Sequence, residues 1–134
     1  MQIKRITKEQ AWELRHTVMW PEKEFDYIKL PGDDNALHYG LFNENELVSA
    51  VSLFVQDEEA QFRKFATLSN RQNRGYGSRL LEFVLNEAQR QGVKRIYCNA
   101  RTIKAPFYEK FGLTRTDVVF AKGGKDYVVM ERIF

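Results

Sequence analysis

The chain has 134 residues, of which 43% are hydrophobic and 29% charged, with three prolines and eight glycines. This composition is typical of one globular domain and excludes a disordered chain and a multidomain enzyme. The net charge of +3 permits an anionic ligand but is too small to indicate a nucleic-acid-binding protein. A single cysteine, Cys98, excludes an internal disulfide, and two isolated histidines provide no metal site, so we expect no bound metal.

No stretch of the chain has the length of a membrane-spanning segment. The longest apolar-rich stretch, residues 47–55, covers nine residues and contains two serines, whereas a spanning helix needs about 20. The N-terminal residues also lack the apolar run of a signal peptide. We therefore expect a soluble, cytoplasmic protein whose partners include neither a membrane nor a nucleic acid.

The first half of the chain predicts a strand, a helix, a loop and three more strands. Residues 2–6 have the pattern of a short strand, and Thr7 with Gln10 forms a capping-box pattern, so a helix should begin there and end at Pro21. Residues 20–35 hold two prolines and the run Gly-Asp-Asp-Asn, which favours a long loop with one short helical turn. Apolar segments joined by short polar turns predict strands at about 36–43, 46–56 and 60–69.

The second half begins with the clearest helix of the sequence. An apolar stripe of leucine, valine and alanine predicts this helix at about 77–91. The remaining predicted elements are a strand at about 94–99, a helix at about 104–111 and two strands at about 113–121 and 126–133, which flank the hairpin signal Lys-Gly-Gly-Lys.

This order of elements predicts an α/β domain of the mixed α+β kind. The strand, helix and strand between residues 60 and 99 require a right-handed crossover and a parallel pair of strands. Most other connections have hairpin length, which favours antiparallel pairs. We therefore expect a central mixed, mostly antiparallel sheet of six or seven strands, with helices on both faces and one parallel β-α-β crossover.

The segment that precedes the clearest helix has the features of a phosphate-binding site. Gly75 and Gly77 allow a tight turn and a close approach of the backbone to a ligand. The helix that begins there presents unpaired N–H groups and the positive end of its dipole. The P-loop does not fit, and neither does the dinucleotide fingerprint, because Leu80 stands at its third glycine. From the glycines alone, a tight strand-to-helix turn without a ligand is an equal alternative.

Two segments of the sequence resemble motifs of the GCN5-related N-acetyltransferase (GNAT) superfamily. Gln72 to Gly77 has the pattern Gln-x-x-Gly-x-Gly of its motif A, at a strand-to-helix junction. Residues 107–113, Phe-Tyr-Glu-Lys-Phe-Gly-Leu, closely resemble a second segment of that family, in the family's order. The similarity covers about residues 46–113, and the element order extends it to most of the chain. It implies the family's fold and an acyltransferase that uses acetyl-CoA as co-substrate.

The resemblance also implies roles for individual residues. In this family two parallel strands part, and the thioester lies between them. Tyr108 matches the tyrosine often proposed to protonate the leaving thiolate, and the N–H of Thr67 or Leu68 is the candidate oxyanion donor. The residues implied for the acetyl-CoA site are Phe65, Ala66, Thr67, Gln72, Asn73, Arg74, Gly75, Tyr76, Gly77, Ser78, Asn99 and Phe107.

Two positions depart from the family's pattern. Gln61 stands where histone-acetyltransferase-like members have a glutamate, and a glutamine is no base at neutral pH. Glu59, Asp57, His38 or a chain of waters are the alternatives for a base, and a histone-type lysine substrate becomes less expected. Arg101 stands where the family often has an asparagine, seven residues before the tyrosine.

Other conspicuous side chains have simpler explanations. Cys98 is expected as a small buried hydrophobic residue rather than a catalytic thiol. The acidic runs at 33–34 and 57–59 are expected to be solvated turns. Three aromatic residues either line the acceptor pocket or pack in the core: Trp20, Tyr27 and Tyr39.

The sequence therefore predicts an N-acetyltransferase that moves an acetyl group from acetyl-CoA to a primary amine, most simply of a small molecule. The transfer would be a direct attack in a ternary complex. Two alternatives stay open: a protein or peptide amine as acceptor, and an acyl-CoA-binding regulatory module without turnover. Many members of the family dimerise, so a homodimer is a further expectation to test.

Overall fold

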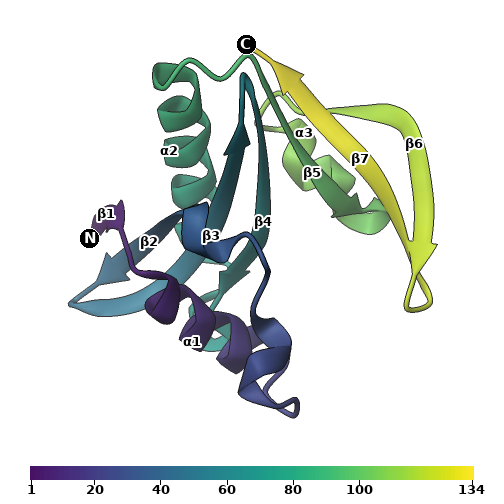
Figure 1. Cartoon of the computed structure of the whole chain (residues 1–134). Coiled ribbons are helices and arrows are strands. Elements are labelled where there is room, and N and C mark those ends of the chain that lie inside the picture. The colour runs from purple at the N-terminus through teal and green to yellow at the C-terminus, as the bar shows by residue number, and fades with distance from the viewer.

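The computed structural model describes all 134 residues and arranges them around one seven-stranded sheet (Figure 1). The strand order is β1-β2-β3-β4-β5-β7-β6. Only β4 and β5 pair in parallel, and every other neighbouring pair is antiparallel. The predicted mixed sheet with one parallel crossover is thus confirmed. The strands are β1 Gln2–Arg5, β2 Leu37–Asn43, β3 Glu46–Gln56, β4 Glu59–Thr67, β5 Arg95–Arg101, β6 Thr114–Lys122 and β7 Lys125–Ile133.

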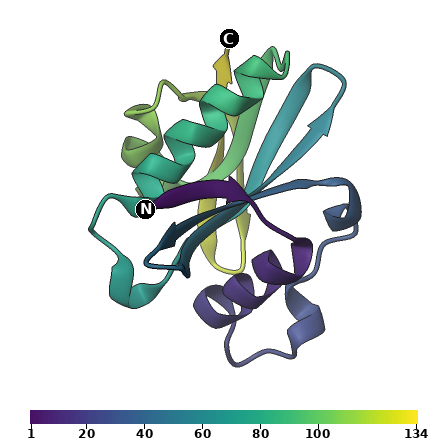
Figure 2. The ribbon, with the colours of Figure 1, turned by 90° about the vertical axis from the view of Figure 1, so that its left-hand side faces the viewer.

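Three helices cover the two faces of the sheet (Figure 2). The buried side chains of α2 join the main core of 20 buried residues, whereas α1 packs on a second cluster that includes Ala50. Ala50 and Val51 are neighbours in β3 and belong to different clusters, so the clusters lie on opposite faces. No helix is long and apolar enough to cross a membrane. The helices are α1 Lys8–Met19, α2 Tyr76–Arg90 and α3 Ala105–Glu109.

The capping box predicted at the start of α1 is present. The Thr7 side chain accepts a hydrogen bond from the Gln10 backbone N–H at 3.1 Å, and the Gln10 side chain accepts one from the Thr7 N–H at 2.9 Å. These two bonds satisfy N–H groups that have no partner within the helix. The local sequence therefore sets the point where α1 begins.

The structure differs from the sequence prediction in two short segments. The loop at 20–35 contains two 3₁₀ turns, η1 Phe25–Ile28 and η2 Asp33–Asn35, where one helical turn was predicted. The helix predicted at 104–111 is shorter and spans only Ala105–Glu109 in the structure, where it follows the 3₁₀ turn η4, Thr102–Lys104. Both differences concern single turns, whose hydrogen bonds depend on tertiary contacts more than on residue pattern.

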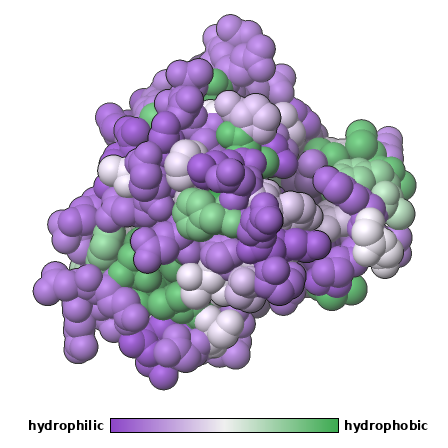
Figure 3. Space-filling view, turned by 60° about the horizontal axis from the view of Figure 1, so that its bottom comes forward, coloured by the Kyte–Doolittle hydropathy of each residue, from purple (hydrophilic) through white to green (hydrophobic).

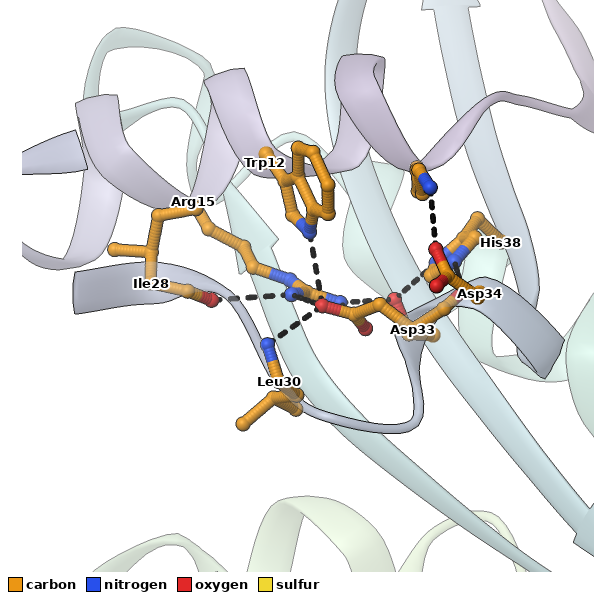
Figure 4. Close-up of polar contacts among 9 residues, drawn as sticks. Trp12, Arg15, Ile28, Leu30, Asp33, Asp34 and His38 are labelled. Atoms are coloured by element: carbon orange, nitrogen blue, oxygen red, sulfur yellow. Dashed lines mark hydrogen bonds and ion pairs between the residues drawn. The ribbon is translucent and has the colours of Figure 1, made fainter. Parts of the chain in front are cut away.

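Asp33 corrects the prediction that the acidic run at 33–34 is a solvated turn. Its side chain is 2% exposed and accepts two hydrogen bonds from Arg15, at 2.8 and 2.9 Å (Figure 4). The Trp12 indole N–H and the Leu30 backbone N–H donate two more, at 2.8 and 2.7 Å. Burial alone would raise the pKa of Asp33, but these donors more than offset it and lower the pKa to about 2. Asp33 therefore ties the loop before β2 to α1.

Candidate active site

Strands β4 and β5 separate and leave a cavity between them. Their parallel pairing ends at Gln61 and Tyr97, after which β4 stays with β3 and β5 stays with β7. Figure 1 shows the two strands diverging toward the bottom of the view. The cavity between them has a volume of about 590 Å³, within the range of small-molecule sites. The separation of the two strands thus creates a candidate binding site within the sheet.

A bulge in β4 lies at the edge of this cavity. Between the pairs that involve Ala50 and Ser52 of β3, strand β4 has one extra residue. Lys64 lies in this stretch with a φ of 56°, in the left-handed region that favours glycine. Its ammonium group lies 4.4 Å from the centre of the Trp20 ring, next to the end of α1. The bulge therefore aims a lysine at the α1 side of the cavity.

The glycine loop adopts the geometry of an anion site. Gly75 caps α2 in the left-handed conformation, with a φ of 83°, and the space beside it is open. No side chain caps the N-terminus of α2, so its first N–H groups face outward without such a partner. A Cβ on Gly77 would come within 3.2 Å of the Phe65 ring, so this glycine lets α2 pack closely on β4. The two glycines thus serve different purposes.

The structure brings nearly all of the predicted site residues to one cavity. Arg74 is the exception, since it is exposed and does not belong to the cavity wall. Their common location supports the prediction, while the role of each residue stays a proposal. The predicted residues that line the cavity are Phe65, Ala66, Thr67, Gln72, Asn73, Gly75, Tyr76, Gly77, Ser78, Asn99, Phe107 and Tyr108.

Tyr108 enters the cavity from α3. Its ring packs against Phe62 and Phe107, at centroid distances of 5.9 and 5.2 Å, and its hydroxyl has no hydrogen-bond partner within the protein. Burial raises the pKa of Tyr108, and the nearby Cys98 raises it further. The phenol therefore keeps its proton throughout the neutral and mildly alkaline range and is available as a donor.

Cys98 is buried, as predicted, although it also contributes to the cavity wall. Its side chain is 3% exposed, and burial raises the pKa of the thiol to about 12. A thiol with this pKa is not a thiolate at neutral pH, so it is a poor nucleophile. Cys98 therefore serves as packing beside Tyr108.

None of the side chains proposed as a base lines the cavity between β4 and β5. Gln61, Asp57 and Glu59 line a second, wider concavity at the closed end of the two strands. Glu59 also forms an ion pair with Arg95 at 2.9 Å. His38 is 3% exposed, its two ring nitrogens are hydrogen-bonded at 2.7 and 2.9 Å, and burial lowers its pKa. None of the side chains proposed as a base therefore lies at the cavity that contains Tyr108.

The structure narrows the choice of oxyanion donor to one of two candidates. The Leu68 N–H donates to the Val48 carbonyl at 2.9 Å and is engaged with β3. Successive N–H groups of a strand point to opposite edges, so the Thr67 N–H points toward β5. Thr67 is therefore the remaining candidate.

The three aromatic residues considered for the acceptor pocket lie in different environments. Tyr39 is 2% exposed and packs edge-on against Phe83 in the core, so it is not part of the pocket. Trp20 contacts Lys64, and Tyr27 packs edge-on against Trp20 at a centroid distance of 5.4 Å. Neither Trp20 nor Tyr27 lines the cavity; Trp20 contacts its wall through Lys64, and Tyr27 contacts Trp20.

Several cavity residues had no signal in the sequence. Tyr127 reaches the wall from β7, where it pairs with Arg101. Met19 reaches it from the end of α1. The wall also carries five cationic side chains and no carboxylate; the cations are Arg63, Lys64, Arg71, Arg101 and Lys104.

Comparison with known proteins gives a consistent result. The model of a family described as "Acetyltransferase (GNAT) family" matches residues 5–113. The chain is 28% identical over 121 residues to YitI, an uncharacterized N-acetyltransferase of Bacillus subtilis, and the match covers 84% of this chain and 81% of the relative.

Solved structures show the same fold. A Lactobacillus plantarum protein described as a candidate N-acetyltransferase superposes with a TM-score of 0.85 at 20% identity, over 99% of both chains. A GNAT family acetyltransferase of Elizabethkingia anophelis, solved with acetyl-CoA bound, superposes with a TM-score of 0.77 at 20% identity, over 99% of this chain and 97% of that one. The predicted fold is confirmed by these likenesses.

Proposed function

The chain belongs to the acetyltransferase (GNAT) family, which is a family of acyltransferase enzymes, and we propose that it transfers an acetyl group from acetyl-CoA to the primary amine of a small molecule. The resemblance predicted from two short motifs is confirmed at the level of the family. One observation carries the proposal: the glycine loop, the parted strands and Tyr108 all face one cavity. The acetyl-CoA in the Elizabethkingia anophelis structure supports the choice of co-substrate.

Acetyl-CoA fits the residues of the cavity. Its pyrophosphate would accept hydrogen bonds from the N–H groups at the start of α2, beside the open space at Gly75. The pantetheine arm would follow β4 along Phe65, Ala66 and Thr67, where β5 has already separated from β4. In this pose the thioester comes to the centre of the cavity, within the aromatic wall that includes Tyr108.

The proposed reaction is one direct transfer. The neutral amine attacks the thioester carbonyl, so that a C–N bond forms, and the Thr67 N–H stabilises the oxyanion. The C–S bond then breaks, the Tyr108 hydroxyl gives its proton to the leaving thiolate, and water takes the proton of the new ammonium. The protein holds the two reactants together, which removes most of the entropic cost of their encounter. The high pKa of Cys98 argues against an acetyl-enzyme on this thiol.

Calorimetry and an assay for free thiol test this proposal. We expect saturable one-to-one binding of acetyl-CoA, weaker binding of dephospho-CoA, and none of ATP at the same concentration. A panel of primary amines should then release CoA thiol from acetyl-CoA. Absence of binding at acetyl-CoA concentrations of about 1 mM would overturn the assignment of acetyl-CoA as the co-substrate.

Two alternatives make different predictions in the same assay. An acyl-CoA-binding regulatory module would bind acetyl-CoA tightly and release no thiol with any amine. A protein or peptide acetyltransferase would release thiol with peptides and not with free amines. The cytoplasmic location and the homodimer expected from the sequence stay predictions.

A further inference from the structure

Positive charge is concentrated in the cavity. Its wall carries five cationic side chains and no carboxylate, although the whole chain is nearly balanced, with 21 Lys and Arg against 18 Asp and Glu. The imbalance is therefore local to the site. A cavity lined by one sign of charge attracts ligands of the opposite sign.

The phosphates of acetyl-CoA explain only part of this charge. Arg71 lies between β4 and the glycine loop, beside the proposed phosphate site, and pairs with Glu46 at 2.7 Å. Lys64 lies at the other end of the proposed cofactor strand, before Phe65, and its side chain turns to Trp20 on the α1 side. The phosphates bind at the opposite end of this strand, so they leave the charge of Lys64 unmatched.

Lys64 has no anionic partner within the protein. It is half-buried and forms neither an ion pair nor a hydrogen bond. Four elements supply the charges that act on it. Three of these charges are positive: Arg63 beside it in β4, Arg15 of α1, and Lys122 at the end of β6. The only negative one, Asp33, is already bound to Arg15.

This environment penalises the charged form of Lys64. Burial, and then the neighbouring cations, lower the pKa of its ammonium group to about 8. An anion that docks against it would relieve this penalty, because a half-buried cation gains more from a counter-ion than an exposed one does. The face at the bottom of Figure 1 is mostly hydrophilic, with separate hydrophobic patches (Figure 3).

We infer that the acceptor carries an anionic group, a carboxylate or a phosphate, in addition to its amine, and that Lys64 binds this group. The inference rests on the proposed function and names the class of its acceptor. The anion would lie between Lys64 and the Lys122 turn, while the amine reaches the thioester beside Tyr108. A polyamine or another polycation would meet five cationic side chains, of which only Arg71 has an ion-pair partner, so it is disfavoured.

Matched pairs of amines test this class directly. Straight-chain amino acids with one to five carbons between amine and carboxylate are compared with their carboxamides, and phosphoethanolamine is compared with ethanolamine. Spermidine serves as the polycation. We expect kcat/KM, measured by thiol release, to be about 10- to 100-fold higher for the favoured acid than for its neutral partner, the range of a charge-assisted hydrogen bond. The preferred member of the acid set distinguishes carboxylate from phosphate.

Variants of Lys64 locate the effect. Lys64→Met keeps the length of the side chain without its charge, and it should raise KM for the acid and bring the ratio of kcat/KM between the acid and its neutral partner close to one. Lys64→Arg should restore most of the preference. Lys94→Met is the matched control, because Lys94 is exposed just before β5 and lies outside the cavity wall.

Binding measurements separate this inference from the proposed function. Calorimetry with the CoA-loaded protein compares the same acid and neutral pairs without turnover. Selective binding of acids without thiol release would support anion binding at Lys64 and overturn the enzymatic proposal. Thiol release without preference for acids, a preference for spermidine, or a preference that survives in Lys64→Met would overturn the inference alone. If neither selective binding nor turnover is observed, both the inference and the proposed function are overturned.

Discussion

The two ends of the cavity are held in place by different kinds of interaction. At the phosphate-loop end, the conformation is set by the backbone: Gly75 supplies a left-handed residue, and Gly77 lets α2 approach Phe65. At the α1 end, the conformation is set by side chains, because the buried Asp33 binds Arg15 of α1. The first end is determined within a few consecutive residues, whereas the second depends on partners from separate elements.

This difference predicts that substitutions at the two ends of the cavity have separate effects. A change at the glycine loop should affect cofactor binding more than it affects the stability of the fold. A change at Asp33 should lower the stability of the fold. The variant molecules that remain folded should still bind acetyl-CoA at the phosphate-loop end. Four experiments test this, from the largest expected effect to the smallest.

Asp33→Ala should have the largest effect, a loss of about 3–5 kcal/mol in the free energy of unfolding, because it leaves the Arg15 guanidinium buried without its partner. Urea unfolding measures it. Asp34→Ala is the matched control, since Asp34 is exposed and pairs only with Lys8 at the surface. Equal stabilities of the two variants would show that the Arg15–Asp33 pair does not hold this end.

Gly77→Glu should abolish most of the binding of acetyl-CoA, by about 100-fold or more in Kd, or about 3 kcal/mol. The new side chain would crowd Phe65 and place a carboxylate beside the phosphates. Calorimetry measures the loss, and Gly77→Ala separates the steric part from the charge. If the glutamate variant still binds acetyl-CoA, the phosphates do not bind at this loop.

Acid should weaken the α1 end through Asp33. The pKa of this carboxyl falls from 3.8 to about 2 on folding, so its contribution is present above about pH 4 and is lost as the pH falls toward 2. The shift corresponds to about 2 kcal/mol. Unfolding free energies measured between pH 5 and pH 2 should therefore fall more steeply in the parent protein than in Asp33→Asn. Parallel curves would mean that Asp33 has an ordinary pKa in the folded protein.

Tyr108→Phe should have the smallest effect, roughly a 10-fold loss in kcat, or about 1.4 kcal/mol, because water can partly replace a proton donor to a thiolate. The Kd of acetyl-CoA should hardly change. Because burial raises the pKa of Tyr108, the parent enzyme should show no loss of rate from its ionisation up to about pH 10. A kcat that is equal in both proteins at every pH would exclude Tyr108 as the acid.

Features that depend on consecutive residues were predictable from the sequence. The Thr7 capping box, the bounds of β3 and the buried stripe of α2 follow from local hydrogen bonds and hydrophobic periodicity. The tight turn of the glycine loop was predictable for the same reason, because glycine allows backbone conformations that other residues rarely adopt. The order and spacing of the predicted elements also indicated one parallel crossover and mostly antiparallel pairs of strands.

Features that depend on distant partners appear only in the folded molecule. Asp33 has the same local sequence as a solvated turn, and its burial follows from Arg15 and Trp12 on α1. Lys64 has the pattern of an ordinary strand residue, and the bulge that turns it to Trp20 comes from the register with β3. Pattern and propensity report the free energy of local conformations, whereas burial, register and charge pairing are properties of chain segments that meet only when the sheet forms.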